Sequence, residues 1–120
     1  MELIFSKSLT KTDVQKRLSV PMTSLASLPD FEEGHTVGLR VRDARKGKVW
    51  KFKCSIRKKK HPKPVFCSKW LEYVRFNDLQ VGDGIEFYKE MEEATGVNYY
   101  KIEVKKAVKI FGVIFGYVEA

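Results

Sequence analysis

The side chains that could do metal or nucleophilic chemistry in this sequence are few and lie far apart. Cys54 and Cys67 form no C-x-x-C pair, and His35 and His61 do not stand at a spacing that a zinc site would need. A structural zinc ion requires four converging ligands, which these residues do not supply. We therefore expect no metal site, and we interpret the two cysteines as reduced, largely buried thiols.

The carboxylates show no catalytic arrangement either. Pro29-Asp30 and Glu103-Val104-Lys105 supply the pieces of a Pro-Asp…Glu-x-Lys nuclease motif, but more than seventy residues separate them. The sequence contains no P-loop, no Ser–His–Asp or Cys–His constellation and no paired carboxylates for two metal ions. We therefore expect a protein that is not an enzyme and that needs no cofactor.

The chemistry that the sequence does offer is a concentration of positive charge. The net charge is +8, and residues 40–63 hold twelve Lys and Arg against the single acid Asp43. Residues 1–17 add four bases against two acids, and the rest of the chain is net acidic. Cations that neutralise phosphates release the counterions condensed on duplex DNA, which drives binding. This distribution predicts a nucleic-acid partner, the alternative being a charged surface that only confers solubility.

The densest part of this charge is the run Arg-Lys-Lys-Lys-His-Pro-Lys-Pro at residues 57–64. Its two prolines exclude a central strand, so we expect an exposed loop or arm between two strands. Such an arm could hold a phosphate backbone, and it could equally serve as a nuclear localisation signal. The predicted DNA contacts in this run are Arg57, Lys58, Lys59, Lys60 and Lys63.

The elements that must position these cations are mostly strands. Alternation of apolar and polar residues predicts strands over 37–41 and 50–56, joined as a hairpin by the turn at Gly47. Lys51 and Lys53 fall on the polar face of the second strand, where they either line a DNA surface or are simply solvated. Further strands are predicted over residues 85–87 and 100–104, with shorter ones at 3–5, 19–21 and 65–67.

Two short helices complete the prediction, one over residues 23–28 and one that Ser68 would cap and that continues to Val74. The predicted core contains the aromatic residues at buried phases, namely Trp50, Phe52, Trp70 and Phe87. Many short strands with two short helices indicate a closed or nearly closed β-barrel. A chain of 120 residues has room for one such domain. We place it at residues 1–107, followed by a strand or tail at 108–120.

Location follows from what the sequence lacks. No stretch of about 18 apolar residues is present, so we expect no membrane span. The first residues do not have the basic and apolar regions of a signal peptide. These features predict a cytosolic or nuclear protein.

Four motifs, in order, resemble the plant B3 domain over residues 3–105. They are Leu9-Thr10-Lys11-Thr12-Asp13-Val14, Arg17-Leu18-Ser19-Val20-Pro21, Gly47-Lys48-Val49-Trp50-Lys51-Phe52-Lys53, and Trp70 followed by Phe76-Asn77 and Leu79-Gln80-Val81-Gly82-Asp83. The resemblance implies a mainly β, seven-stranded open pseudobarrel with two short α-helices. It also implies a nuclear transcriptional regulator that binds double-stranded DNA in the major groove through two arms, at residues 11–19 and 57–64.

Roles for the first arm follow from side-chain chemistry. Arg17 is the leading candidate for reading a base, because arginine can donate two hydrogen bonds to guanine, worth about 1–3 kcal/mol of discrimination. A phosphate contact or a surface ion pair is an equal alternative for it. Asp13 is expected to be structural, accepting backbone N–H groups to shape the arm. The other predicted contacts are Lys11 and Thr12 on phosphates, Gln15 and Lys16 near base edges, and Ser19.

The sequence departs from the B3 pattern at several points. The first arm is two residues shorter between Val14 and Arg17, and Met22 stands where a basic residue is usual. Lys69 replaces a glycine before the helix tryptophan. The second arm is almost entirely basic, which shifts the expected balance from base readout toward phosphate contact.

The end of the chain poses a separate question. Lys109-Ile110-Phe111-Gly112-Val113 resembles the Arg/Lys-Leu-Phe-Gly-Val motif of some B3-containing repressors, which docks a corepressor, while a last strand or a tail is the alternative. No dimerisation helix is apparent, so we expect a monomer on DNA. The alternatives to duplex recognition are non-specific or single-stranded nucleic-acid binding, or a protein-interaction module on the same barrel.

Overall fold

The computed structural model describes residues 2–28, 36–56, 63–110 and 113–119. Of the predicted contacts, Arg57, Lys58, Lys59 and Lys60 lie outside the described residues, as do Phe111 and Gly112 of the C-terminal motif. In the described part, no helix has the length and apolar character needed to cross a membrane.

Eight strands form one sheet in the described residues. The strands are β1 (Glu2–Ser8), β2 (Leu18–Ser19), β3 (Thr36–Asp43), β4 (Val49–Ser55), β5 (Val65–Phe66), β6 (Gly84–Met91), β7 (Asn98–Ile110) and β8 (Val113–Glu119). Neighbours run in the order β1-β6-β7-β3-β4-β5-β2, with β8 paired to β7 beside this path. Only the β3–β7 pair is parallel among these described strands.

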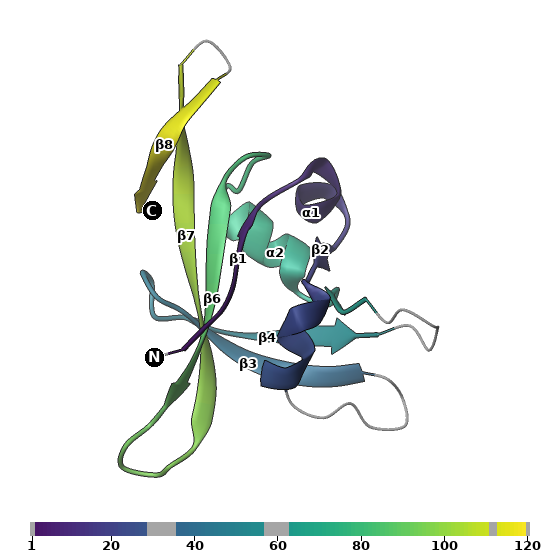
Figure 1. Cartoon of the computed structure of the whole chain (residues 1–120), viewed down its shortest axis with the longest axis vertical. Coiled ribbons are helices and arrows are strands. Elements are labelled where there is room, and N and C mark those ends of the chain that lie inside the picture. Colours follow the sequence, from purple (N-terminus) through teal and green to yellow (C-terminus); the bar gives the residue numbers. More distant parts are fainter. Residues whose placement is uncertain (1, 29–35, 57–62, 111–112, 120) are drawn as a thin grey trace.

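The sheet curls without closing, because its end strands β1 and β2 do not pair with each other in the described part (Figure 1). The mainly β, seven-stranded open pseudobarrel is confirmed along this path, and β8 is an eighth strand. A fully closed barrel is not formed. Strand β7 runs without a break across residues 107 and 108, where the sequence suggested a boundary.

The predicted hairpin is formed by β3 and β4 in antiparallel register, with Val41 opposite Trp50. Its turn depends on two residues. The Asp43 carboxylate accepts the backbone N–H groups of Arg45 and Lys46 at 2.9 and 3.0 Å, and Gly47 takes a positive φ of 70°. A residue with a side chain is strained at such a φ, which explains the glycine.

Three helical segments lie within the described residues. The segment predicted at 23–28 is a 3₁₀ helix, η1 (Met22–Ser27), and the segment predicted from Ser68 is α2 (Trp70–Phe76). The third, α1 (Lys11–Gln15), lies in the predicted first arm and was not among the predicted helices. The expected Ser68 cap is wrong by one residue, since Lys69 is the N-cap of α2.

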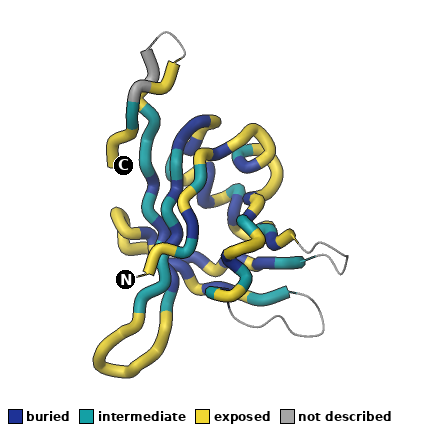
Figure 2. The backbone as a smooth tube through the Cα atoms, in the orientation of Figure 1, coloured by how far each residue is buried: buried dark blue, intermediate teal, exposed yellow. Residues whose placement is uncertain are grey.

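The core lies between the curled sheet and α2 (Figure 2). The four aromatic residues predicted for the core are all buried, and rings contact each other from Trp50 through Phe52, Phe66 and Phe87. The prediction of two buried thiols is half wrong. Cys54 is buried, but Cys67 is exposed, because it follows β5 at the surface beside Lys53.

Candidate nucleic-acid interface

The predicted first arm, residues 11–19, and the preceding Thr10 fold around one buried carboxylate. Asp13 is fully buried, and it accepts hydrogen bonds from the backbone N–H groups of Thr10 at 2.8 Å and Ser19 at 3.1 Å. The ammonium group of Lys7 also contacts it at 2.9 Å. The expected structural role of Asp13 is therefore confirmed. Its bonds tie both ends of the arm together.

Two further contacts hold this arm in place. Thr10 caps α1, with its hydroxyl accepting from the Asp13 N–H at 3.3 Å, which completes a capping box. The indole N–H of Trp70 donates to the Asp13 carbonyl oxygen at 2.7 Å, which joins the arm to helix α2. The arm is thus anchored to the core through a buried hydrogen bond.

Burial by itself raises the pKa of Asp13, but the hydrogen bonds from Thr10, Lys7 and Ser19 outweigh it. The pKa of Asp13 is therefore held below its usual range. The carboxylate stays ionised at neutral pH, so the arm keeps its shape under the conditions in which it would meet a ligand.

Packing of the arm turns its polar side chains outward. Asp13, Leu18 and Val20 are buried, and the polar residues between them are exposed. All of the first-arm contacts predicted from the sequence are on this exposed side. They are Lys11, Thr12, Gln15, Lys16, Arg17 and Ser19.

Strand pairing brings the first arm next to the start of the basic run. Ser19 of β2 lies opposite Val65 of β5, and Ser55 of β4 lies opposite the same Val65 on its other side. The Val20 N–H donates to the Pro64 carbonyl at 2.9 Å. Directly opposed residues of an antiparallel pair project to the same face, so Ser19, Val65 and Ser55 form a row across three strands. The two arms predicted from the sequence are therefore rooted side by side.

The same face continues along β4 and β3. Lys53 and Lys51 follow Ser55 at intervals of two, and both are exposed while Phe52 between them is buried. Arg40 lies opposite Lys51 in the hairpin, so it joins this face. Lys63, just before β5, is also exposed.

Sequence reasoning missed Arg40 and Arg42 as site residues. Both are exposed and alternate with the buried Leu39 and Val41. The signal was present, because the alternation is visible in the sequence and the Gly47 turn fixes the register that sets Arg40 against Lys51. Arg42 lies over the ring of Tyr99, 5.2 Å from its centre.

We define the cationic face as the exposed basic residues of the first arm and of strands β3 and β4, together with Lys63 just before β5. Its described members are Lys11, Lys16, Arg17, Arg40, Arg42, Lys51, Lys53 and Lys63. Within the described residues none of them forms an ion pair. Their charge is therefore available to an external anion.

Lys101 and Lys105 of β7 behave differently. Lys101 lies 3.6 Å from Glu90 and 3.8 Å from Glu103, and Lys105 pairs with Glu86, Glu103 and Glu119 at 2.8 to 3.9 Å. A lysine whose charge is neutralised by nearby glutamates attracts a polyanion only weakly. The fold thus neutralises Lys101 and Lys105 with glutamates, although Lys101 lies opposite Arg42 in the β3–β7 pair.

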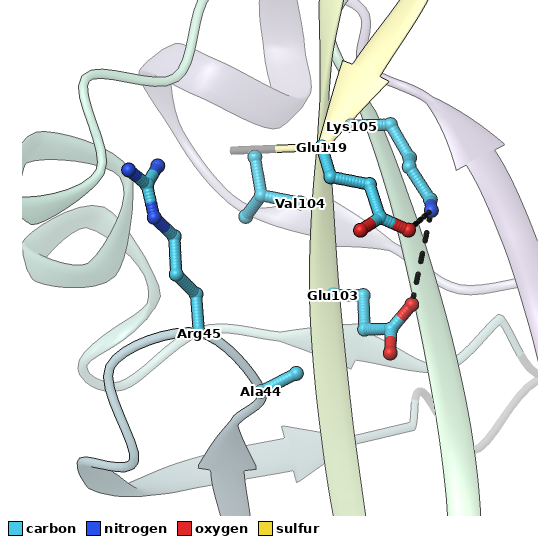
Figure 3. Close-up of a pocket in the computed structure, with 6 residues that line it drawn as sticks. All are labelled: Ala44, Arg45, Glu103, Val104, Lys105 and Glu119. Carbon is cyan, nitrogen blue, oxygen red and sulfur yellow. Dashed lines mark hydrogen bonds and ion pairs between the residues drawn. The ribbon is translucent and has the colours of Figure 1, made fainter.

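A surface hollow at the end of β3 contains one of these ion-paired lysines, Lys105 (Figure 3). Its lining residues are Ala44, Arg45, Glu103, Val104, Lys105 and Glu119, and Lys105 bridges the two carboxylates there. In the parts of the chain that the structure describes, no group of three or more His, Cys, Asp or Glu is arranged to hold a metal ion. The arrangement suits a structural ion-pair cluster rather than a catalytic site.

Comparison with known proteins agrees with this geometry. A family model described as the B3 DNA-binding domain matches residues 5–102. The chain belongs to the B3 DNA-binding domain family. This is a family of DNA-binding domains of transcription factors and not of enzymes. A search of curated protein sequences finds no match.

Two solved structures resemble this B3 domain. An Arabidopsis FUS3–DNA complex is 27% identical, with a TM-score of 0.76 over 88% of this chain and 99% of that one. An Arabidopsis thaliana transcription factor LEC2–DNA complex is 22% identical, with a TM-score of 0.67 over 82% of this chain and 89% of that one. The first supports both fold and family, and the second supports the fold.

Proposed function

We propose that this B3 domain binds double-stranded DNA in the major groove through its two arms, as part of a transcriptional regulator in the nucleus. The observation that carries the proposal is the cationic face. It joins the first arm to the strands that flank the basic run, and its described cations have no carboxylate of the described chain as a partner. The DNA complexes formed by the structural neighbours FUS3 and LEC2 support the same kind of ligand.

Each part of the face has a distinct role in this proposal. Lysines of the cationic face neutralise phosphates and set the register of the protein on the duplex, which carries no sequence information by itself. Arg17 reads a base, because it is exposed on an arm that Asp13 and Trp70 hold rigidly. Gln15 and Lys16 lie exposed beside it and contribute to the same readout.

The basic run supplies the second arm, with Arg57, Lys58, Lys59, Lys60 and Lys63 on phosphates. One chain carries both arms, so a single copy is sufficient for one DNA site. The corepressor motif remains a prediction. Its described ends, Lys109 with Ile110 and then Val113, finish β7 and begin β8.

Selection from a random pool of DNA duplexes tests the proposal. We expect a short sequence motif to emerge with the wild-type chain, and Arg17→Ala to relax the preference at one position by about 1–3 kcal/mol. The variant with Lys58, Lys59 and Lys60 changed to Ala should weaken binding to all sequences alike.

Two other outcomes have definite meanings. A pool that stays random while binding remains salt-dependent indicates that the shortened first arm has lost base readout and that the domain holds DNA non-specifically. Preference for single strands over duplex, or no binding to DNA at all, would contradict the proposal.

A further inference from the structure

A second surface hollow, of about 280 Å³, lies where β3 and the start of β4 meet the start of β7. Its lining residues are Arg40, Arg42, Val49, Tyr99 and Tyr100. Arg40 and Arg42 stand two residues apart in β3, so their side chains project to the same face from Cα atoms about 7 Å apart. This hollow therefore combines two guanidinium groups with two aromatic rings.

The positive charge of both arginines is available to a ligand. Neither arginine has an ion-pair partner among the described residues. Arg42 lies over the ring of Tyr99, 5.2 Å from its centre, and a stacked guanidinium keeps the N–H groups at its edge free to donate. The Tyr99 hydroxyl donates to Glu90, whose charge Lys101 balances at 3.6 Å. The ring that supports Arg42 is therefore held in place before any ligand binds.

This hollow lies at the end of the cationic face that is farthest from the basic run. Val49 begins β4, and Ser55 ends it just before that run, six residues or about 20 Å further along. In Figure 1, β4 points toward β2, the strand that ends the first arm. Binding at this hollow is therefore separate from the proposed contact of the arms with DNA.

We propose that this hollow binds a phosphate monoester that carries a small apolar or aromatic group. A monoester has a charge of about −1.5 to −2 at pH 7, which matches two free guanidinium groups, whereas a carboxylate or a phosphodiester carries a single charge. Its three terminal oxygens can accept from both arginines, while one guanidinium already pairs with both oxygens of a carboxylate. Charge and donor number thus favour a monoester over an acidic side chain and over the DNA backbone.

The remaining lining residues select the group attached to the phosphate. Val49 is 49% exposed, so its side chain is available for apolar contact beside the rings of Tyr99 and Tyr100. The volume of about 280 Å³ is just below the range of about 300–1,000 Å³ that is usual for small-molecule sites. This hollow therefore has room for a phosphoryl group with a compact substituent, and phenyl phosphate is a suitable probe.

NMR titration of the ¹⁵N-labelled chain with phenyl phosphate, without DNA, tests the proposal. We expect saturable shifts at the amides of Arg40, Arg42, Val49 and Tyr99. Arg42→Gln should weaken binding by about tenfold or more, because it removes charged hydrogen bonds. Arg42→Lys should also weaken it, since an ammonium group keeps the charge but lacks the planar pair of donors. Methyl phenyl phosphate, a diester with the same ring, should bind several-fold more weakly than phenyl phosphate.

Arg75→Gln is the matched control for charge. Arg75 is exposed on α2, outside the cationic face, so this variant loses the same charge and should bind phenyl phosphate as wild type does. The proposal is overturned if phenyl phosphate causes no saturable shift at the lining amides, if Arg42→Gln and Arg75→Gln weaken binding equally, or if the diester binds as tightly as the monoester. The spectra of the variants show in the same experiment whether they fold. Because DNA is absent, failure here leaves the proposed function unaffected.

The same phosphoryl group occurs in free small molecules and on phosphorylated tyrosine side chains. A short phosphotyrosine peptide in the same titration distinguishes these sources. Tighter binding than phenyl phosphate assigns this hollow to a phosphorylated peptide, and weaker binding assigns it to a free small molecule. A peptide that shifts other amides but not those of Arg40 and Arg42 would contradict the peptide assignment.

Discussion

At the scale of single residues, the cationic face depends on a buried anion. Asp13 collects the N–H groups of Thr10 and Ser19 and the ammonium of Lys7, all within 3.1 Å. An ionised acceptor makes stronger hydrogen bonds than a neutral one. A carboxylate in the middle of a basic arm is thus explained by the shape that it imposes, not by contact with a ligand.

Asp13→Asn is therefore expected to lower the free energy of unfolding at pH 7 by about 2–3 kcal/mol, since it removes charged hydrogen bonds in a buried place. Because the folded pKa of Asp13 lies below the unfolded value of about 3.9, its stabilising contribution is present above that value and is lost as pH falls through the folded pKa. Urea unfolding from pH 7 to pH 2 should show a smaller decrease in stability for the variant than for wild type. Equal decreases would contradict this role.

Asp78→Asn is the matched control for this experiment. Asp78 is exposed, and its positive φ of 48° is one that asparagine also tolerates. We expect its unfolding free energy to stay within about 0.5 kcal/mol of wild type at pH 7.

The backbone is strained at Lys69, which has a positive φ of 68° immediately before α2. The left-handed conformation costs a residue with a side chain about 1–2 kcal/mol, whereas glycine adopts it freely but gives up more entropy on folding. Lys69→Gly should therefore raise the unfolding free energy in urea by about 0.5–1 kcal/mol. The Lys69–Glu72 ion pair that this change removes is exposed and contributes little.

Gly96→Ala gives the opposite sign as a control. Gly96 has a φ of 70°, and an added side chain would meet no atom within 4 Å, so any destabilisation comes from the backbone alone. We expect a decrease of about 1 kcal/mol in urea unfolding. A destabilised Lys69→Gly would show that the backbone there is not strained.

The role of a residue could be predicted where its type or its place in an alternating pattern pointed to a single function. A lone acid in a basic arm predicted the structural role of Asp13, and alternation predicted the burial of Phe52. The exposure of Cys67 could not be predicted, because a three-residue apolar run at 65–67 does not reveal that the strand ends at Phe66. Arg40 required the hairpin register in addition to its own strand pattern.

At the scale of elements, helix α2 positions the first arm. Trp70 packs in the core beside Phe52 and Tyr73, and it also donates its indole hydrogen to the Asp13 carbonyl. One side chain thus links the barrel core to a segment that would contact DNA. Rigidity in the arm keeps the entropy cost of binding low.

Trp70→Phe should consequently weaken duplex binding by more than its lower stability explains, because the arm is no longer anchored to α2. Trp50→Phe is the matched control. Trp50 is also buried, but its indole N–H has no hydrogen-bond partner in the described part of the chain. Fluorescence anisotropy with a DNA duplex, together with urea unfolding, compares the two. If Trp70→Phe and Trp50→Phe have equal stability and lose the same amount of affinity, the hydrogen bond from Trp70 to Asp13 does not contribute to DNA binding.

Elements with strong periodicity could be predicted from the sequence, and the β3–β4 hairpin is the best example. Helix α1 could not, because five mostly polar residues carry no apolar periodicity. The parallel pairing of β3 with β7 also leaves no local signal, since Val41 and Tyr100 are far apart in the chain. Long-range pairing is decided by how the whole sheet buries its apolar face.

At the scale of the whole molecule, the fold leaves some cations without an ion pair in the described residues and surrounds others with carboxylates. Those of the cationic face have no ion-pair partner in the described residues, whereas Lys101 and Lys105 of β7 are surrounded by glutamates. The sequence predicted the basic region, and its resemblance to the B3 family implied the open pseudobarrel, but neither could show which cations are neutralised. That distinction requires the register of β6 and β7.

The most direct test of the cationic face as the DNA surface is the salt dependence of duplex affinity for two double variants of equal charge. Lys51→Gln with Lys53→Gln removes unpaired cations, and Lys101→Gln with Lys105→Gln removes paired ones. The slope of log affinity against log salt should become shallower by about 0.9 for each phosphate that is no longer neutralised, about 1.8 for the first variant, and should not change for the second. Equal changes in both variants would show that net charge alone governs binding, and would contradict the assignment of the cationic face as the DNA surface.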